Sequence, residues 1–188
     1  MAQQLKLLLS VALVVMNFCS CLPDRDLFVP NGPTDTTSTG SHILLINEIV
    51  SNGSLDITEF GSAEDWIELY NPGAAPVVVG QGEFYLTDAA GTDDLLFALP
   101  PLTVPSKGFI VVWCDGMDTI ASQIHSNFKL SSSGETIALT RIIDGSPVQA
   151  DLKAYTANIP DGNSEGRTPD GGAAWAIFSV PTPGQKNQ

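Results

Sequence analysis

Oxygen-bearing side chains at alternate positions form the pattern in this sequence that most resembles a metal site. Asp161, Asn163 and Glu165 are separated by one residue each, and Gly166 follows directly. Ca²⁺ takes several oxygen ligands, and a calcium loop begins with such ligands at alternate positions before a glycine. The bidentate Glu that closes such a loop at its twelfth position is missing, because Gly172 stands there. Two interpretations remain: a Ca²⁺ site, or a turn leading into the next segment.

Hydrolytic catalysis needs a nucleophile beside a base, and few residues here could supply the pair. The histidines are His42 and His125, and neither a Gly-x-Ser-x-Gly elbow nor a His-Glu-x-x-His zinc motif occurs. Paired carboxylates such as Glu48 and Glu68 could perform acid–base chemistry on sugars. Glu68 could instead be tied to a backbone group or to Arg167. We predict that the protein is not an enzyme, with a hydrolase or a hydrolase-accessory protein as the alternative.

Aromatic side chains offer a third kind of site. Tyr85, Tyr155 and Trp175 could stack on sugars or anchor a protein partner. Trp66 and Trp113 lie within apolar or alternating runs and are expected to pack in the core. Ordinary packing is the competing interpretation for the first three as well.

The first residues are typical of an export signal. Residues 1–20 contain Lys6 and an apolar run from Leu7 to Met16 that is too short to span a bilayer comfortably. They end in Phe18-Cys19-Ser20-Cys21, which resembles a bacterial lipoprotein signal with Cys21 as the lipidated residue. Residues 21–41 are polar, rich in Pro and Thr, and predict a flexible tether. An ordinary cleaved secretory peptide and a buried N-terminal helix are the alternatives.

The amino-acid composition restricts the classes of molecule that the protein can bind. The 188 residues include 21 Asp and Glu against 8 Lys and Arg, a formal net charge of −13, and the basic residues do not cluster. Because nucleic-acid binding depends on cations that neutralise phosphates, direct binding to DNA or RNA is disfavoured. Of the three cysteines only Cys114 follows the tether, so no disulfide can form within the domain. Cys114 ends an apolar run and is expected to be a buried thiol.

Short apolar runs separated by Gly, Pro, Asn and Asp follow the tether and predict an all-β fold for residues 42–188. In Glu64–Tyr70, Trp66, Glu68 and Tyr70 alternate with Ile67 and Leu69, which indicates a strand with one face in the core. Phe109–Cys114 is apolar on both faces and predicts a central strand. The other expected strands are His42–Val50, Val77–Val79, Phe84–Thr87, Leu95–Leu99, Asn127–Leu130, Glu135–Ile143 and Gln149–Tyr155.

The order of several segments resembles that of the lamin tail domain family in its bacterial, exported form. They are Ile46-Asn47-Glu48-Ile49, Asp65–Pro72, Tyr85–Asp88, Val104–Gly116, His125–Ser131, Gly166–Gly171 and Pro181–Asn187, with Gly134-Glu135 and Trp175 between them. The resemblance covers residues 43–187 and implies an immunoglobulin-like antiparallel β-sandwich in a secreted or surface protein. It implies no reaction, because such sandwiches serve many functions. It also implies a structural, hydrogen-bonding role for His125. Ile142–Ile159 departs from the family pattern, which leaves its strand register open.

These observations together predict a non-catalytic binding module, lipid-anchored by Cys21 to the bacterial outer membrane or cell surface. Its partner would be a protein or a glycan. Without the lipid, the protein would be periplasmic or secreted. A hydrolase-associated protein, of the kind found beside nucleases or phosphatases, is one alternative, and a calcium-stabilised adhesion module is the other. No cofactor is expected apart from the Ca²⁺ considered above.

Overall fold

The computed structural model describes residues 42–188 except 54–57, 59, 93–94 and 158. By its contacts the chain divides into two units, Met1–Thr37 and Ser38–Gln188, and the described residues all belong to the second. None of the described residues is helical. No helix long and apolar enough to cross a membrane is therefore found among them. The predicted export signal, the tether and Cys21 lie outside the described residues.

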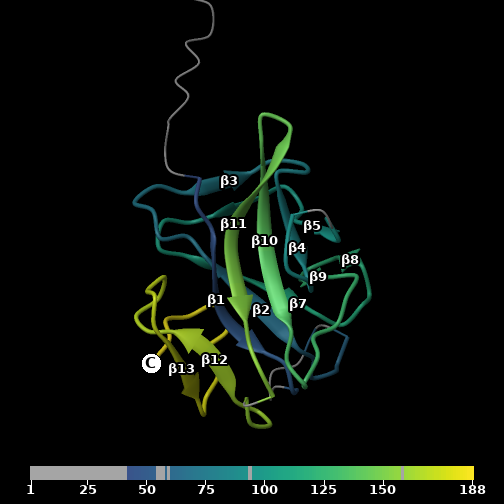
Figure 1. Cartoon of the computed structure of the whole chain (residues 1–188), viewed down its shortest axis with the longest axis vertical. Helices are drawn as coiled ribbons and strands as arrows, with labels where there is room; N and C mark the ends of the chain where they lie inside the picture. Colours follow the sequence, from purple (N-terminus) through teal and green to yellow (C-terminus); the bar gives the residue numbers. More distant parts are fainter. Residues whose placement is uncertain (1–41, 54–57, 59, 93–94, 158) are drawn as a thin grey trace, which may run out of the picture. The chain divides into compact units, whose positions relative to one another are not determined.

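The described strands form an all-β, largely antiparallel sandwich, as the sequence predicts (Figure 1). A seven-stranded sheet has the order β13-β12-β1-β2-β7-β9-β8, a four-stranded sheet the order β11-β10-β4-β5, and β3 pairs with β6. The strands are β1 (Leu45–Val50), β2 (Trp66–Tyr70), β3 (Val77–Val79), β4 (Phe84–Thr87), β5 (Phe97–Ala98), β6 (Leu102–Val104), β7 (Phe109–Trp113), β8 (Thr119–Ile120), β9 (Ile124–His125), β10 (Thr136–Ile143), β11 (Ser146–Ala154), β12 (Ser164–Arg167) and β13 (Trp175–Phe178).

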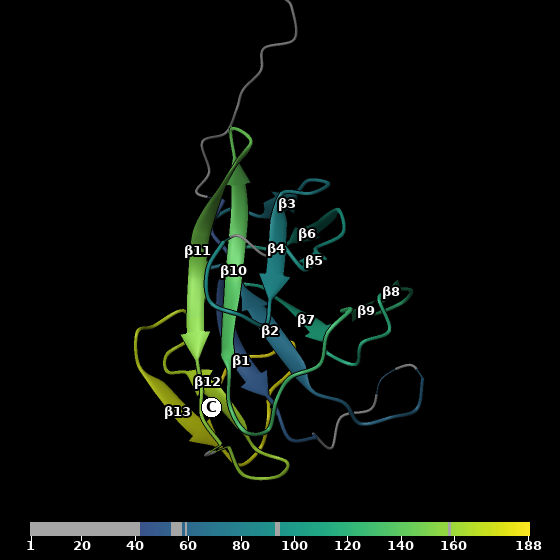
Figure 2. The same ribbon diagram turned by 45° about the vertical axis from the view of Figure 1, so that its right-hand side comes forward.

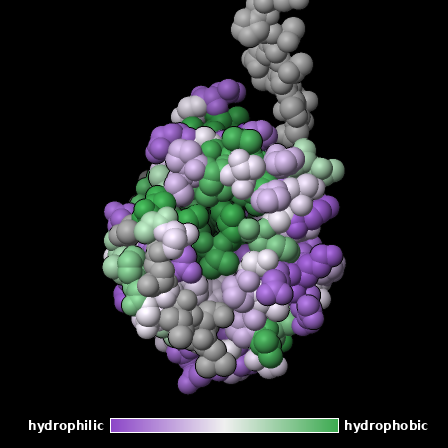
Figure 3. Space-filling model, turned by 180° about the vertical axis from the view of Figure 1, so that it is seen from behind, coloured by the Kyte–Doolittle hydropathy of each residue, from purple (hydrophilic) through white to green (hydrophobic). Residues whose placement is uncertain are grey.

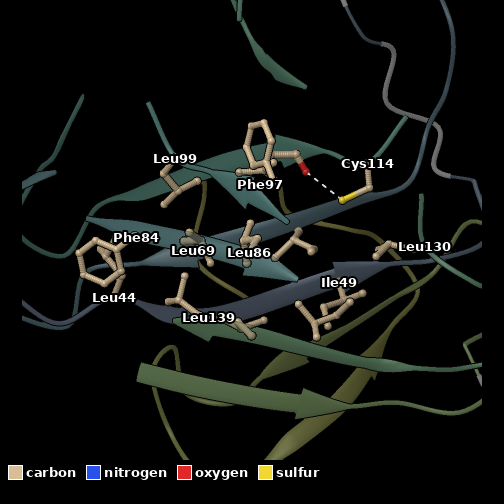
Figure 4. Packing of buried hydrophobic residues seen from close by; sticks show 14 of the residues in the cluster. Leu44, Ile49, Leu69, Phe84, Leu86, Phe97, Leu99, Cys114, Leu130 and Leu139 are labelled. Atoms are coloured by element: carbon tan, nitrogen blue, oxygen red, sulfur yellow. Dashed lines mark hydrogen bonds between the residues drawn. The ribbon is translucent and has the colours of Figure 1, made fainter. Parts of the chain in front are cut away.

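The two main sheets lie face to face around one hydrophobic core. In Figure 1, β10 and β11 lie in front of β1, β2 and β7, and Figure 2 gives the same arrangement turned by 45°. The alternation in β2 sends Ile67 and Leu69 into this core, where they meet Leu86 of β4 and Leu139 of β10 (Figure 4). Burial of this apolar surface is the main favourable contribution to folding. Cys114 lies in the same core, where burial raises the pKa of its thiol well above the usual value.

The opposite face of the seven-stranded sheet, here called the outer face, carries the alternate residues of β2, Trp66, Glu68 and Tyr70. Trp66 of β2 packs there with Val50 of β1 and Trp113 of β7, in a cluster separate from the main core. A bulge interrupts the β1–β2 register between Ile46 and Glu48. Because a bulge adds one residue to a strand, Asn47 and Glu48 can both leave the core while Ile46 and Ile49 remain in it.

Most of the segment whose register the sequence leaves open, Ile142–Ile159, belongs to the β10–β11 hairpin, which ends at Ala154. β10 and β11 pair from Thr136↔Ala154 to Ile143↔Ser146, with one bulge between Leu139 and Thr140. Asp144 and Gly145, both at positive φ (51° and 77°), make the connection. Two adjacent residues in this conformation are what a tight two-residue hairpin turn requires, and Asp-Gly favours it.

Other strand predictions were wrong in detail. Asn127–Leu130 is not a strand, since its only pairing among the described residues is an isolated bridge between Lys129 and Asp115. The short strands β6, β8, β9, β12 and β13 were not predicted. Their sequences are too short or too polar to show periodicity, and neighbouring strands determine their conformation.

Candidate functional site

Two glutamates lie opposite each other at the centre of the outer face. Glu48 of β1 and Glu68 of β2 are cross-strand neighbours, and each side chain belongs to a residue with 0% of its surface exposed. Charged residues are almost never fully buried unless they have partners. The hydrogen bonds of this pair therefore decide whether it can act on a substrate.

Residues 179–188, here called the C-terminal segment, supply most of these partners. Glu48 accepts hydrogen bonds from the backbone N–H of Thr182 at 3.1 Å and from its hydroxyl at 2.9 Å. The Ser164 hydroxyl of β12 also donates to Glu48. Glu68 accepts from the backbone N–H of Gly184 at 2.7 Å and from Asn47 Nδ2 at 3.0 Å. The sequence prediction that Glu68 binds a backbone group is confirmed.

A second set of contacts fixes the end of the same segment. Asn187 donates its backbone N–H to Asp170 at 3.1 Å and its Nδ2 to the Arg167 carbonyl at 2.8 Å. Asp170 also accepts from Asn47 Nδ2 at 3.1 Å. An added Cβ on Gly166 would lie 2.5 Å from Asn187 Nδ2, so only glycine allows this close approach.

Burial raises the pKa of both glutamates. For Glu68, desolvation raises the pKa to about 8 against the opposing hydrogen bonds from Asn47 and Gly184, and the charges of Glu48 and Asp170 add to the rise. Desolvation also raises the pKa of Glu48, and the bonds from Ser164 and Thr182 oppose that rise. At neutral pH Glu68 is therefore mainly protonated. Since protein surrounds both carboxyls, neither can exchange a proton with a bound sugar in this conformation.

His125 is likewise enclosed. Its Nδ1 lies 2.6 Å from Asp115 Oδ2, its ring centroid lies 4.7 Å from that of Phe60, and 0% of the residue is exposed. The neighbouring Ser126 hydroxyl donates to the Phe128 carbonyl at 2.9 Å. This arrangement connects the β9 region to the turn after β7.

Two of the three residues considered for a Ca²⁺ site, Asp161 and Glu165, have protein partners. Asp161 accepts a hydrogen bond from Asn52, and Glu165 forms an ion pair with Lys153 at 2.6 Å. Asn163 lies between them in sequence, directly before β12. Over the described part of the chain, no group of three or more His, Cys, Asp or Glu residues is placed to hold a metal ion.

The three predicted aromatic binding residues do not come together. Tyr155 lies in the core, with 5% exposed, and its hydroxyl donates to the Ser131 carbonyl at 2.9 Å. Trp175 of β13 is half-buried, with Lys153 Nζ 4.2 Å and Arg167 Cζ 4.8 Å from its ring centroid. Those cations occupy ring surface that a ligand would need. Tyr85 is half-buried on β4, between β10 and β5.

A surface groove that could bind a partner lies elsewhere, at the edge of β7. A groove of about 440 Å³ runs between β9 and the C-terminal segment. Its lining includes Ile110 and Val111 of β7, Ile124 of β9, and Pro183. The view from behind shows hydrophobic residues gathered around a hollow on this side of the molecule (Figure 3). A second apolar hollow, of about 370 Å³, lies between the start of β1 and the β10–β11 hairpin.

Sequence reasoning missed this groove. It identified Phe109–Cys114 as a buried central strand, which gave no reason to look for a site there. The available signal was Thr119–Ile124, which is too short and polar to form a long neighbouring strand. No protein-family model and no curated protein matches this sequence, so the geometry alone carries the functional argument.

Proposed function

We propose that this chain is a non-catalytic binding module of the bacterial cell envelope, anchored by a lipid on Cys21. Its folded part, residues 42–188, would be a lamin tail-like, immunoglobulin-like sandwich that recognises a protein or a glycan. The signal-like residues 1–20 and the polar tether support the location. Cys21 would hold the folded part at the membrane surface, and the tether would let it reach a partner.

One observation carries the functional part of this proposal. The groups best suited to acid–base chemistry, Glu48, Glu68 and His125, are fully buried and bonded to other parts of the fold. A catalytic acid or base must come within hydrogen-bond reach of the proton it transfers. The apolar groove beside β7 is open instead, and apolar hollows with a few polar groups are typical binding sites.

Activity assays test the binding role. The purified protein is incubated with phosphoester, nucleic-acid and polysaccharide substrates, alongside the variants His125→Ala and Glu68→Gln. We expect no turnover by any of the three proteins. Turnover by the native protein that Glu68→Gln abolishes, while the variant keeps its melting temperature, would contradict the binding role and favour the hydrolase alternative.

Expression with its own N-terminus in a Gram-negative host tests the anchor. We expect an intact mass that corresponds to cleavage before Cys21 plus acyl chains, and partition into detergent. The Cys21→Ser variant should lose both properties. Cleavage without lipid would leave a soluble envelope or secreted protein and contradict the anchoring.

A further inference from the structure

The two edges of β7 differ in how far they are paired. On one side, all five residues from Phe109 to Trp113 pair with β2. On the other side, pairing with β9 is restricted to Val112↔Ile124 and Trp113↔His125. Within the described part of the chain, the Phe109–Val111 half of this second edge has no strand beside it.

The backbone direction follows from the ladder. The β2–β7 pair begins and ends with hydrogen bonds from Asn71 N–H to the Gly108 carbonyl and from Cys114 N–H to the Asp65 carbonyl. Because alternate residues of an antiparallel strand bond to the same neighbour, the even-numbered residues of β7 face β2. The peptide groups of Phe109 and Val111 therefore point toward the second edge. Trp113 follows the same rule, since its carbonyl accepts from Ser126 N–H on that side.

The groove lies where a further strand would lie. Ile110 and Ile124 line it, and both are half-buried side chains that pack against the main core. Val111 and Pro183 form its wall toward the outer face. An added strand would cover these apolar groups and would hydrogen-bond with the edge of β7. Exposed edges of this kind are the sites at which sheets accept peptides.

Charge selects among possible peptides. Residues 109–125, which form β7, β8, β9 and their connections, contain no Lys or Arg, and of their two acidic residues Asp115 is buried beside His125. Asp118 is exposed, and the whole chain has a formal net charge of −13. Complementary charge speeds association and suppresses unsuitable partners. A peptide that places basic residues toward solvent and apolar residues toward the groove therefore fits this edge.

We propose that the open edge of β7 binds an extended, basic segment of a partner protein as an added β-strand beside Phe109–Val111. The segment alternates apolar residues, which enter the groove near Ile110 and Ile124, with Lys or Arg. This inference rests on the proposed binding function and specifies its partner class as protein. Binding requires no movement of the C-terminal segment, whose residues Pro183 and Gly184 already form the opposite wall.

The test uses the full chain and a labelled peptide of alternating valine and lysine. Fluorescence anisotropy measures affinity at low salt, and NMR measures the exchange of the Val111 amide. We expect saturable binding that slows exchange at Val111. Val111→Pro removes the N–H at this edge while the bonds to β2 remain, and should weaken binding about tenfold. A peptide of alternating valine and glutamate should bind more weakly than the lysine peptide.

A pair of exposed serines provides a control that leaves the backbone unchanged. Ser122→Lys adds a cation to the groove, and Ser132→Lys adds the same charge in the turn before β10. We expect only Ser122→Lys to weaken binding of the lysine peptide. No saturable binding below about 1 mM, or equal binding by all variants that retain the native melting temperature, would overturn the inference. Displacement of the lysine peptide by a neutral soluble glucan, equally from the native protein and from Val111→Pro, would also overturn the inference. That result would still agree with the broader proposal of a binding function.

Discussion

The two halves of the outer face differ in whether another segment of the chain covers them. Over β1 and β2, the C-terminal segment covers the sheet, and its backbone N–H groups donate to Glu48 and Glu68. Beside β7 and β9, the sheet ends in a groove with apolar walls and an edge of main-chain groups. One half thus contains a peptide segment held by buried carboxyls, and the other has the shape to receive one. In our proposal, the half covered by the C-terminal segment serves stability and the half beside β7 and β9 serves recognition.

The largest loss of stability is expected for a substitution in the half of the outer face that the C-terminal segment covers. Glu48→Ala removes the acceptor for Ser164 and for two donors of Thr182. Because buried donors without acceptors are costly, we expect the free energy of unfolding to fall by about 4 kcal/mol. Denaturant unfolding measures this change. A loss below about 1 kcal/mol would show that the C-terminal segment is held by other contacts.

The second prediction concerns pH. The pKa of Glu68 rises from 4.5 to about 8 on folding, so between these values the folded state binds a proton that the unfolded state lacks. Stability from this group is complete below pH 4.5 and is lost as the pH rises through about 8. We expect the free energy of unfolding to fall by about 1 kcal/mol per pH unit between pH 5 and 8.

Glu68→Gln is the control for the pH prediction, because the amide does not titrate. Its NH2 group must face either the Asn47 or the Gly184 donor, so the comparison uses the pH dependence of stability and not its absolute value. Its unfolding free energy should vary less between pH 5 and 8 than that of the native protein. Equal pH profiles for the two proteins would show that Glu68 does not titrate in this range.

A smaller effect is expected where the end of the chain meets β12. Gly166→Ala places a methyl group 2.5 Å from Asn187 Nδ2, 3.1 Å from Asn187 Cγ and 3.1 Å from Phe178 Cε2. We expect a loss of about 2 kcal/mol, with a smaller loss when Asn187→Ala is already present. A double-mutant cycle measured by denaturant unfolding gives the coupling. Strict additivity would mean that Asn187 does not contact β12 in solution.

The smallest effect is expected in the open half. Val111→Thr changes a half-buried groove residue that makes no hydrogen bond through its side chain. Val111 packs against the Trp66–Trp113 cluster but is only half-buried, so the unfolding free energy should change by about 1 kcal/mol or less. Thermal unfolding provides the measurement. A loss comparable to that of Glu48→Ala would remove the contrast between the two halves.

Sequence reasoning recovered the fold better than the site, for physical reasons. Alternation in β2 and the apolar run in β7 made those strands visible, because one or both faces must meet the core. The Glu48–Glu68 pair was recognised as a possible acid–base site, but its coverage by residues 179–188 depends on contacts across more than 100 positions. The groove was not predicted, because it arises where β9 begins, beside the unpaired half of β7, rather than from any motif. Oxygen-bearing side chains do alternate at Asp161, Asn163 and Glu165, but the sequence could not show that Glu165 forms an ion pair with Lys153 of β11.

Amide hydrogen exchange of the unliganded full chain tests the contrast most directly. The account predicts strong protection of the Thr182 and Gly184 amides, which bond to buried carboxyls near the end of the chain. It predicts weak protection of the Val111 amide, although Val111 lies in the middle of a strand. Rapid exchange at Thr182 and Gly184 together with strong protection at Val111 would contradict the division of the outer face into a closed and an open half.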